Sequence, residues 1–408
     1  MGNINTGDTA FVLICAALVC LMTPGLAFFY GGLVRKKNVI TIMMQSFISM
    51  GVVTLIWFLG GFSLAFGKDV GGIIGNLQYF GLKGVGFTPN PAHGATIPFL
   101  VFFIYQLMFA IITPALITGA FADRMNFKSY LKFLIIWSIL VYIPICHWIW
   151  GGGFLQKLGV IDFAGGIVVH VSAGVAALTS AYFIGKRHIL SKESTAPNNI
   201  VLVAIGTGLL WFGWFGFNSG SALAVNKAAI IAFVNTHIAA CAAMVSYLLI
   251  LWENKKKPSL AGALTGTVAG LATITPAAGY VKPWAALLIG FISSIVCYWA
   301  IQVRMKRDID DALDTWGVHG VGGILGSILV GVFANSSING VNGLLYGNIH
   351  QFLVQILGVL ICAVYSFVIT YIILKILNAV EPIKVSNEIQ EKGLDESLHG
   401  EKAYNFED

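Results

Sequence analysis

DFAGGIVVHVSAG (162–174) and DALDTWGVHGVGG (311–323) share one pattern: an aspartate, six residues, Val-His, three residues and a glycine. Each stretch opens an apolar segment of about 20 residues, the length that a helix needs to cross a bilayer core of about 30 Å. The two segments lie five apart in the chain, so helices that cross in alternating directions run oppositely there, as in an inverted repeat. Eight residues at about 1.5 Å each carry each histidine about 12 Å inward from its own face. His170 and His319 are therefore predicted to lie within about 6 Å of each other in depth, near the midplane.

The composition indicates a membrane rather than water around most of the chain. Of 408 residues, 57% are apolar and 10% are charged, whereas a soluble domain has about 25% charged residues. The mean hydropathy is +0.83. Segments long enough to cross a bilayer lie at about 10–33, 39–66, 97–121, 130–149, 162–184, 199–218, 228–251, 259–278, 283–303, 311–334 and 351–378. We predict an all-α integral membrane protein with eleven transmembrane helices.

The basic residues predict the orientation of these helices. With the N-terminus outside, 19 of the 24 Lys and Arg residues, Lys192 and Lys256 among them, fall in inner loops or the tail, as the positive-inside rule requires. The net charge of +6 therefore has a membrane explanation, and no nucleic acid partner is expected. The first segment lacks a basic leader and is too long for a signal-peptide core, so we expect it to be retained. The topology is predicted to be N-out and C-in.

The predicted organisation is a membrane domain, 1–380, followed by a cytoplasmic C-terminal tail, 381–408. The membrane domain comprises repeat one (about 10–184), repeat two (about 199–334) and an eleventh helix (about 351–378). The tail is polar and acidic, and composition alone favours disorder there.

Ionisable residues inside the segments are the first candidates for function, because charge is costly in a bilayer. The repeat makes His170 and His319 a pair, although buried packing or ligation of a metal or haem would also fit two histidines. His237 has no repeat partner and is expected in the core. The six cysteines form no C-x-x-C motif and read as small buried apolar residues.

Aromatic residues cluster at the predicted outer ends of three segments. Trp150 precedes three glycines, the stretch 211–221 reads WFGWFGFNSGS, and Tyr105 and Phe109 lie on one helix face. Such residues often form a belt in the lipid interface. Clustered with glycines and a serine, they favour a lined vestibule, where ring faces bind cations with about 0.5–2 kcal/mol each. The residues thus indicate a pore for a small cation or polar solute.

At these residues the chain closely resembles the Amt/Mep/Rh ammonium transporter family, in its Amt branch. The stretches that carry the resemblance are TPGLAFFYGGLVRKKN (23–38), FADRMNF (121–127), WGGG (150–153), DFAGGIVVH (162–170), GWFGFNSGSA (213–222), DTWGVHGVGG (314–323) and GLDESLHGEKAY (393–404). They cover nearly the whole chain.

The resemblance implies an outer recruitment site for ammonium formed by Trp150, Ser221 and Phe109. Phe109 and Phe217 resemble a stacked phenyl gate below that site. Many family members have phenylalanine one turn before the gate, where this chain has Tyr105. Its hydroxyl could add a hydrogen-bonding partner or change the affinity of recruitment.

Deeper in the pore, His170 and His319 resemble the family's twin histidines, and Trp214 resembles a pore-lining tryptophan. Asp162 resembles the acid that organises the outer mouth. Ammonia would pass the histidines, with its proton either released outside or carried separately along them.

The resemblance further implies a homotrimer in the cell membrane, with one pore in each subunit and methylammonium as a substrate analogue. It implies that the tail is ordered and packs on the inner loops, where a PII-type signal protein binds in some relatives. No cofactor, metal or enzyme activity is expected. Two alternatives remain at this point: an ammonium sensor with weak transport, and a bis-histidine membrane redox protein.

Overall fold

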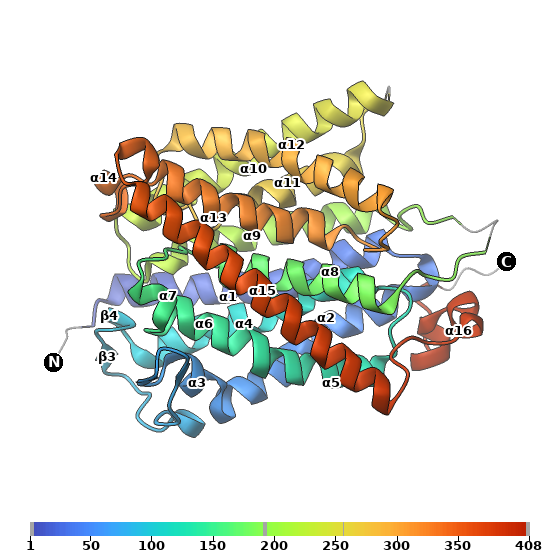
Figure 1. Cartoon of the computed structure of the whole chain (residues 1–408), viewed down its shortest axis with the longest axis horizontal. Coiled ribbons are helices and arrows are strands. Elements are labelled where there is room, and N and C mark those ends of the chain that lie inside the picture. The colour runs from blue at the N-terminus through green and yellow to red at the C-terminus, as the bar shows by residue number, and fades with distance from the viewer. Residues whose placement is uncertain (1–3, 191–193, 256, 405–408) are drawn as a thin grey trace.

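The computed structural model describes residues 4–190, 194–255 and 257–404. Lys192, Lys256 and tail residues 405–408 lie outside the described residues. The fold is a bundle of helices, most of them long (Figure 1). These are α1 (Thr6–Leu33), α2 (Val39–Ile56), α3 (Phe62–Phe66), α4 (Phe99–Phe121), α5 (Phe127–Trp137), α6 (Ile143–Trp150), α8 (Ser172–Ile184), α9 (Ile200–Ser219), α10 (Lys227–Lys255), α11 (Leu260–Ile274), α12 (Pro283–Lys306), α13 (Val321–Phe333) and α15 (Ile349–Val380).

Several of these helices are continued by π-helical or 3-10 turns. The π-helical segments are η2 (Trp57–Gly61), η4 (Ser138–Tyr142), η5 (Gly166–Val171), η7 (Trp316–Gly320) and η9 (Asp395–His399). The 3-10 turns are η1 (Lys36–Asn38), η3 (Phe80–Leu82), η6 (Gly220–Ala222) and η8 (Leu344–Tyr346). Two long helices thus continue through a π-turn, from α2 to α3 and from α5 to α6.

Within the described residues, ten helices are long and apolar enough to cross a membrane. Each of the eleven predicted segments contains a helix at its expected place. The predicted eighth segment, 259–278, is the exception in length, because α11 is a shorter apolar helix of 15 residues. An all-helical membrane protein is therefore confirmed, and the count of eleven crossings stays a prediction.

The two ends of the bundle carry different small elements (Figure 1). One end, here called the hairpin end, carries two antiparallel pairs of short strands together with two short helices. These are β1 (Asp69–Val70) with β2 (Ile74–Gly75), β3 (Pro89–Asn90) with β4 (Gly94–Pro98), α7 (Phe154–Lys157) and α14 (Ser336–Asn339). The opposite end, the tail end, carries α16 (Asn387–Lys392) and η9. α15 crosses the bundle diagonally over α8 and α13 and so ties the two halves of the chain together.

Glycines set how closely the central helices approach. α1 packs along α9, and a Cβ added at Gly206 would lie 2.2 Å from the Phe29 backbone nitrogen. A Cβ at Gly174 on α8 would lie 2.1 Å from the Cα of Gly320 on η7. Small residues at such crossings let helix backbones touch, which is how apolar helices associate without a hydrophobic driving force.

The helices that carry the repeated motif begin later than the sequence suggests. The expected starts are 162 and 311, whereas the helical turns begin at Gly166 and Trp316. The reason is that Asp162 and Asp311 stand outside their helices and bond to the first backbone N–H groups from there. Gly165, with φ of 113°, makes the turn between cap and helix.

The tail is ordered between its start and residue 404, so the disorder favoured by its composition is wrong for these residues. Asp395 accepts hydrogen bonds from the backbone of Ile40 at 2.9 Å and Thr41 at 2.8 Å, and from the Thr41 hydroxyl. The tail backbone also pairs with the loop after α4, where Val385 N donates to Arg124 O. The polar side chain of Asp395 thus caps the start of α2.

Candidate functional site

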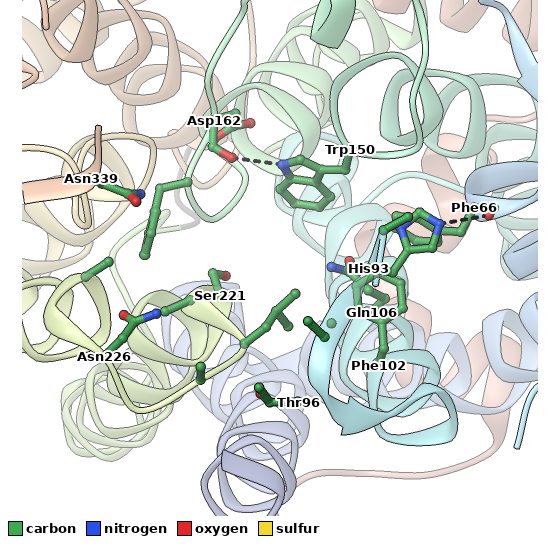
Figure 2. Close-up of a pocket in the computed structure, with 18 of the residues that line it drawn as sticks. Phe66, His93, Thr96, Phe102, Gln106, Trp150, Asp162, Ser221, Asn226 and Asn339 are labelled. Carbon is green, nitrogen blue, oxygen red and sulfur yellow. Dashed lines mark hydrogen bonds between the residues drawn. The ribbon is translucent and has the colours of Figure 1, made fainter. Parts of the chain in front are cut away.

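A cavity of about 450 Å³ opens at the hairpin end (Figure 2). Three residues singled out from the sequence line it together: Trp150, Asp162 and Ser221. His93 and Gln106 also line it, and sequence reasoning missed both. Gln106 is buried, and its amide oxygen has no hydrogen-bond partner among the described residues.

Asp162 organises this mouth through backbone contacts. Its carboxylate accepts four N–H bonds of 2.7–3.0 Å from residues 165–168, the start of the helix that carries His170. Its backbone carbonyl accepts a 2.8 Å bond from Trp150 Nε1, drawn in Figure 2. One residue thus fixes both Trp150 and the helix that carries His170.

Aromatic rings close the cavity from below. The Trp150 and Phe109 rings meet edge to face with centroids 5.9 Å apart. Phe109 and Phe217 pack on each other with ring centroids 4.3 Å apart and planes inclined by 35°, and each is 1% exposed. Phe109 contacts Trp150, which lines the cavity, and Phe217 lines a second, narrow cavity beside the histidines, so this ring pair, here called the phenyl stack, lies between the two.

Tyr105 is fully buried, and its ring packs on Phe109 at 5.0 Å. Its hydroxyl lies 3.0 Å from the Gly216 carbonyl oxygen and 2.9 Å from that of Phe217, and it contacts Ser221 Oγ at 3.2 Å. Ser221 Oγ in turn donates to Phe217 O at 2.9 Å. The tyrosine hydroxyl is therefore bound to the end of α9, and it fastens Ser221 rather than standing free in the cavity.

Below the stack, His170 and His319 are in contact. Their Nδ1 atoms lie 3.3 Å apart, with ring centroids 5.3 Å apart and planes inclined by 21°. Only one Nδ1 can carry the shared hydrogen, so in the neutral pair one ring presents an acceptor Nε2 and the other a donor Nε2. Both histidines lie in π-helical turns, which occur frequently at functional sites.

The histidines line a narrow cavity of about 10 Å³, close to the smallest space that holds one water molecule. Its other walls are apolar: Met22, Leu26, Ile112, Leu116, Val169, Leu210, Trp214, Phe217 and Val268. Trp214 stacks on His170 at 5.5 Å and is held by a 2.9 Å bond from its Nε1 to Thr275 Oγ1. A space of this size cannot take a porphyrin, which argues against the haem alternative.

At the tail end, a cavity of about 520 Å³ is lined by charged residues. Arg187 binds Asp310 through two side-chain bonds of 2.8 and 2.9 Å. Burial raises the pKa of the Asp310 carboxyl, but the Arg187 contacts outweigh burial and hold this pKa at about 2. Arg187 also reaches Asp123 at 3.4 Å, and Asp123 binds Arg35 at 2.9 Å. These ion pairs join four loops of the tail end, those after α1, α4, α8 and α12.

Two other histidines lie differently from what the sequence suggests. His237 is exposed on the side of α10, where it packs on Trp211 at 5.4 Å, so the expected core position is wrong. The apolar side chains near it, such as Phe233 and Val234, are likewise exposed on the outside of the bundle. His147, left without a role by the sequence, is fully buried three residues before Trp150.

Comparison with known proteins gives a consistent result. A model of the Ammonium Transporter Family matches residues 10–404. The ammonium transporter of Bacillus subtilis (strain 168) is 47% identical over 403 residues, which cover 98% of each chain. The crystal structure of Candida albicans Mep2 superposes with a TM-score of 0.89 at 35% identity, over 95% of this chain and 88% of that one. A structure named "Sensor Amt Protein" has a TM-score of 0.89 at 31% identity, over 96% and 98%. The chain therefore belongs to the Ammonium Transporter Family.

Proposed function

We propose that this protein transports ammonium across the cell membrane, and that the twin-histidine cavity is the narrow part of its path. The observation that carries the proposal is the order of the parts: an aromatic outer cavity, a phenyl stack and a buried histidine pair. Family membership supplies the substrate. Relatives named as transporters also agree with a protein that is not an enzyme.

Recruitment of NH4+ falls to Trp150, Phe109 and Ser221 at the base of the outer cavity. The ring faces attract the cation with about 0.5–2 kcal/mol each. Ser221 Oγ gives its hydrogen to Phe217 O and also contacts the Tyr105 hydroxyl, which leaves a lone pair to accept an N–H of the substrate. A potassium ion has no N–H to donate, so the same site would favour ammonium.

Passage beyond the stack of Phe109 and Phe217 favours NH3. An ion buried in an apolar channel costs several kcal/mol, and the walls of the narrow cavity are apolar apart from the histidines. With one Nε2 donating and the other accepting, the histidine pair suits a molecule that does both. The proton would either return outside or pass along the imidazoles, because a neutral pair can act as a wall or as a relay.

The topology we propose places the hairpin end outside and the tail end in the cytoplasm. It comprises eleven crossings, with α11 as a short one, arranged as two inverted five-helix repeats followed by α15. The paired caps Asp162 and Asp311 and the paired π-turns at the histidines support the repeat. We propose a homotrimer, and a PII-type signal protein as a partner at the tail end.

Proteoliposomes test this function directly. An inward ammonium or methylammonium gradient should drive uptake, and an ammonium jump should show whether current accompanies it. His170→Ala should abolish uptake while the protein stays folded, because the pair loses both its shared hydrogen bond and its polar lining. Wild-type flux in that variant would refute a pore role for the histidines.

The sensor reading is supported by the likeness to the "Sensor Amt Protein" structure. It differs from transport in a measurable way. A sensor would bind ammonium with little uptake by the wild type, whereas a transporter would sustain flux that His319→Ala changes.

A further inference from the structure

His147 occupies an unusual position in the last turn of α6. Its ring is 0% exposed. Nδ1 lies 2.8 Å from the carbonyl oxygen of Ala65, and Nε2 lies 2.9 Å from the Asp69 carboxylate. A carbonyl oxygen accepts hydrogen bonds and cannot donate, so Nδ1 must carry a hydrogen to bond there.

The partner of the other ring nitrogen is an ionised acid. Hydrogen bonds from His147 and Lys157 lower the pKa of Asp69 to about 2. Lys157 Nζ lies 2.6 Å from the same carboxylate. Both neighbours of the ring are therefore acceptors, and His147 bonds to both only as the imidazolium, with hydrogen on each nitrogen. The charged and titratable groups around the ring are Asp69 on β1, Lys157 on α7 and His93 between β3 and β4.

The same residue holds the turn that follows Trp150. The backbone carbonyl of His147 accepts 3.0 Å bonds from the N–H groups of Gly151 and Gly153. A Cβ added at Gly151 would lie only 1.9 Å from Ala65 O, the acceptor of the His147 ring. The ring, its own carbonyl and the glycine turn thus meet at one point, directly beside Trp150.

The loop that carries Asp69 is fastened to α6 and α7 at further points. Trp148 Nε1 donates to Ile73 O at 2.8 Å, and Phe154 N donates to Gly72 O at 2.9 Å. Of the loop contacts with α6, the one between Asp69 and His147 involves charged groups, whereas the Trp148 contact is a neutral hydrogen bond to a backbone carbonyl. A change in the protonation of His147 therefore acts on the Asp69 contact.

We propose that His147, held as an imidazolium between Ala65 and Asp69, is a positioning residue that fixes Trp150 at the outer site. The inference rests on the proposed function, since it concerns how the recruitment site is held. Loss of the second proton leaves one buried acceptor without a donor, which weakens the bond to Ala65 or to Asp69. The Trp150 turn then shifts against Phe109, and the site binds ammonium less tightly as pH rises.

Two variants separate this role from general packing. In His147→Asn, the side-chain amide can still donate a hydrogen bond to Ala65 O, but the shorter side chain does not reach Asp69. Asp69→Asn keeps the shape of the loop but can donate to a neutral imidazole through its amide, so the second proton on His147 is no longer needed. Asp308→Asn is the matched control, because it removes an exposed carboxylate that pairs with Lys186 at the tail end.

The measurement is methylammonium uptake by proteoliposomes at a series of pH values, with KM and the maximal rate determined at each. For the wild type and Asp308→Asn, we expect KM to rise with pH while the maximal rate changes little. His147→Asn should raise KM about tenfold at the acid end, since a displacement of ~1 Å at a binding group costs up to ~100-fold. Asp69→Asn should flatten the dependence of KM on pH.

The outcomes distinguish the two proposals. A folded Asp69→Asn variant that keeps the wild-type dependence of KM on pH overturns the inference, whether or not His147→Asn folds. Absence of uptake by the wild type at every pH instead overturns the proposed function. A flat profile in Asp69→Asn beside a sloping profile in Asp308→Asn supports the positioning role.

Discussion

Replacing Gly174 by alanine adds one methyl group where two backbones touch. The new Cβ would lie 2.1 Å from the Cα and the nitrogen of Gly320, next to His319. Ordinary contact begins at 3.4 Å, so α8 and η7 must separate by about 1.3 Å. Overpacking of this kind typically costs about 1–3 kcal/mol. Because the separation occurs beside the histidine pair, it should also lengthen the 3.3 Å contact between the two Nδ1 atoms.

We expect Gly174→Ala to lower the midpoint of thermal unfolding in detergent and to reduce methylammonium uptake about 100-fold, the cost of a misplacement of ~1 Å at a functional group. Gly51→Ala is the matched control. Gly51 also lies inside a helix, but an added Cβ has no atom within 4 Å, so the change should leave uptake intact and favour the helix by up to ~1 kcal/mol. If Gly174→Ala unfolds at the same temperature as Gly51→Ala and takes up methylammonium equally fast, close approach of these helices does not set the geometry of the pore.

Three further predictions concern the outer site and the tail end. Trp150→Leu should weaken selection of ammonium over K+ by about 2- to 30-fold, the loss of one cation–π contact, and unchanged discrimination in competition assays would argue against that contact. Ending the chain after Glu391 should reduce binding of a PII-type protein in pull-down experiments, because the removal of Asp395 frees the start of α2; full binding would show that the tail is not needed. Asp310, whose pKa in the folded protein is about 2, stabilises the fold fully above about pH 4, and this stabilisation should be lost as pH falls towards 2. Asp310→Asn should therefore show a flatter acid unfolding curve than the wild type.

The parts predicted from sequence are those that depend on composition or on an internal repeat. Apolar length alone predicts the helices, because the bilayer fixes how many residues a crossing needs. The contact of His170 with His319 follows from one motif occurring twice at equal depth. Neither inference needs knowledge of a particular side-chain contact.

What the sequence did not predict depends on partners far away in the chain. His147 bonds to Asp69, 78 residues earlier, and the local sequence of α6 does not indicate this contact. The hydroxyl of Tyr105 is taken up by carbonyls on α9, 111 and 112 residues later. The expected core position of His237, which has no repeat partner, is wrong because membrane helices are apolar on the outside as well. Hydrophobicity therefore cannot tell the inside of such a bundle from its surface.

The contact of Asp395 with the start of α2 has a consequence for biosynthesis. The two partners are 355 residues apart, so a ribosome that adds about 5–20 residues per second makes the acid roughly 20–70 s after Ile40 has emerged. During that interval the first backbone N–H groups of α2 have only water or lipid headgroups as partners. The start of α2 is thus completed by a residue that is made long after α2 itself. A chain that is cut short in translation would expose this unfinished surface to the proteases that clear incomplete membrane proteins.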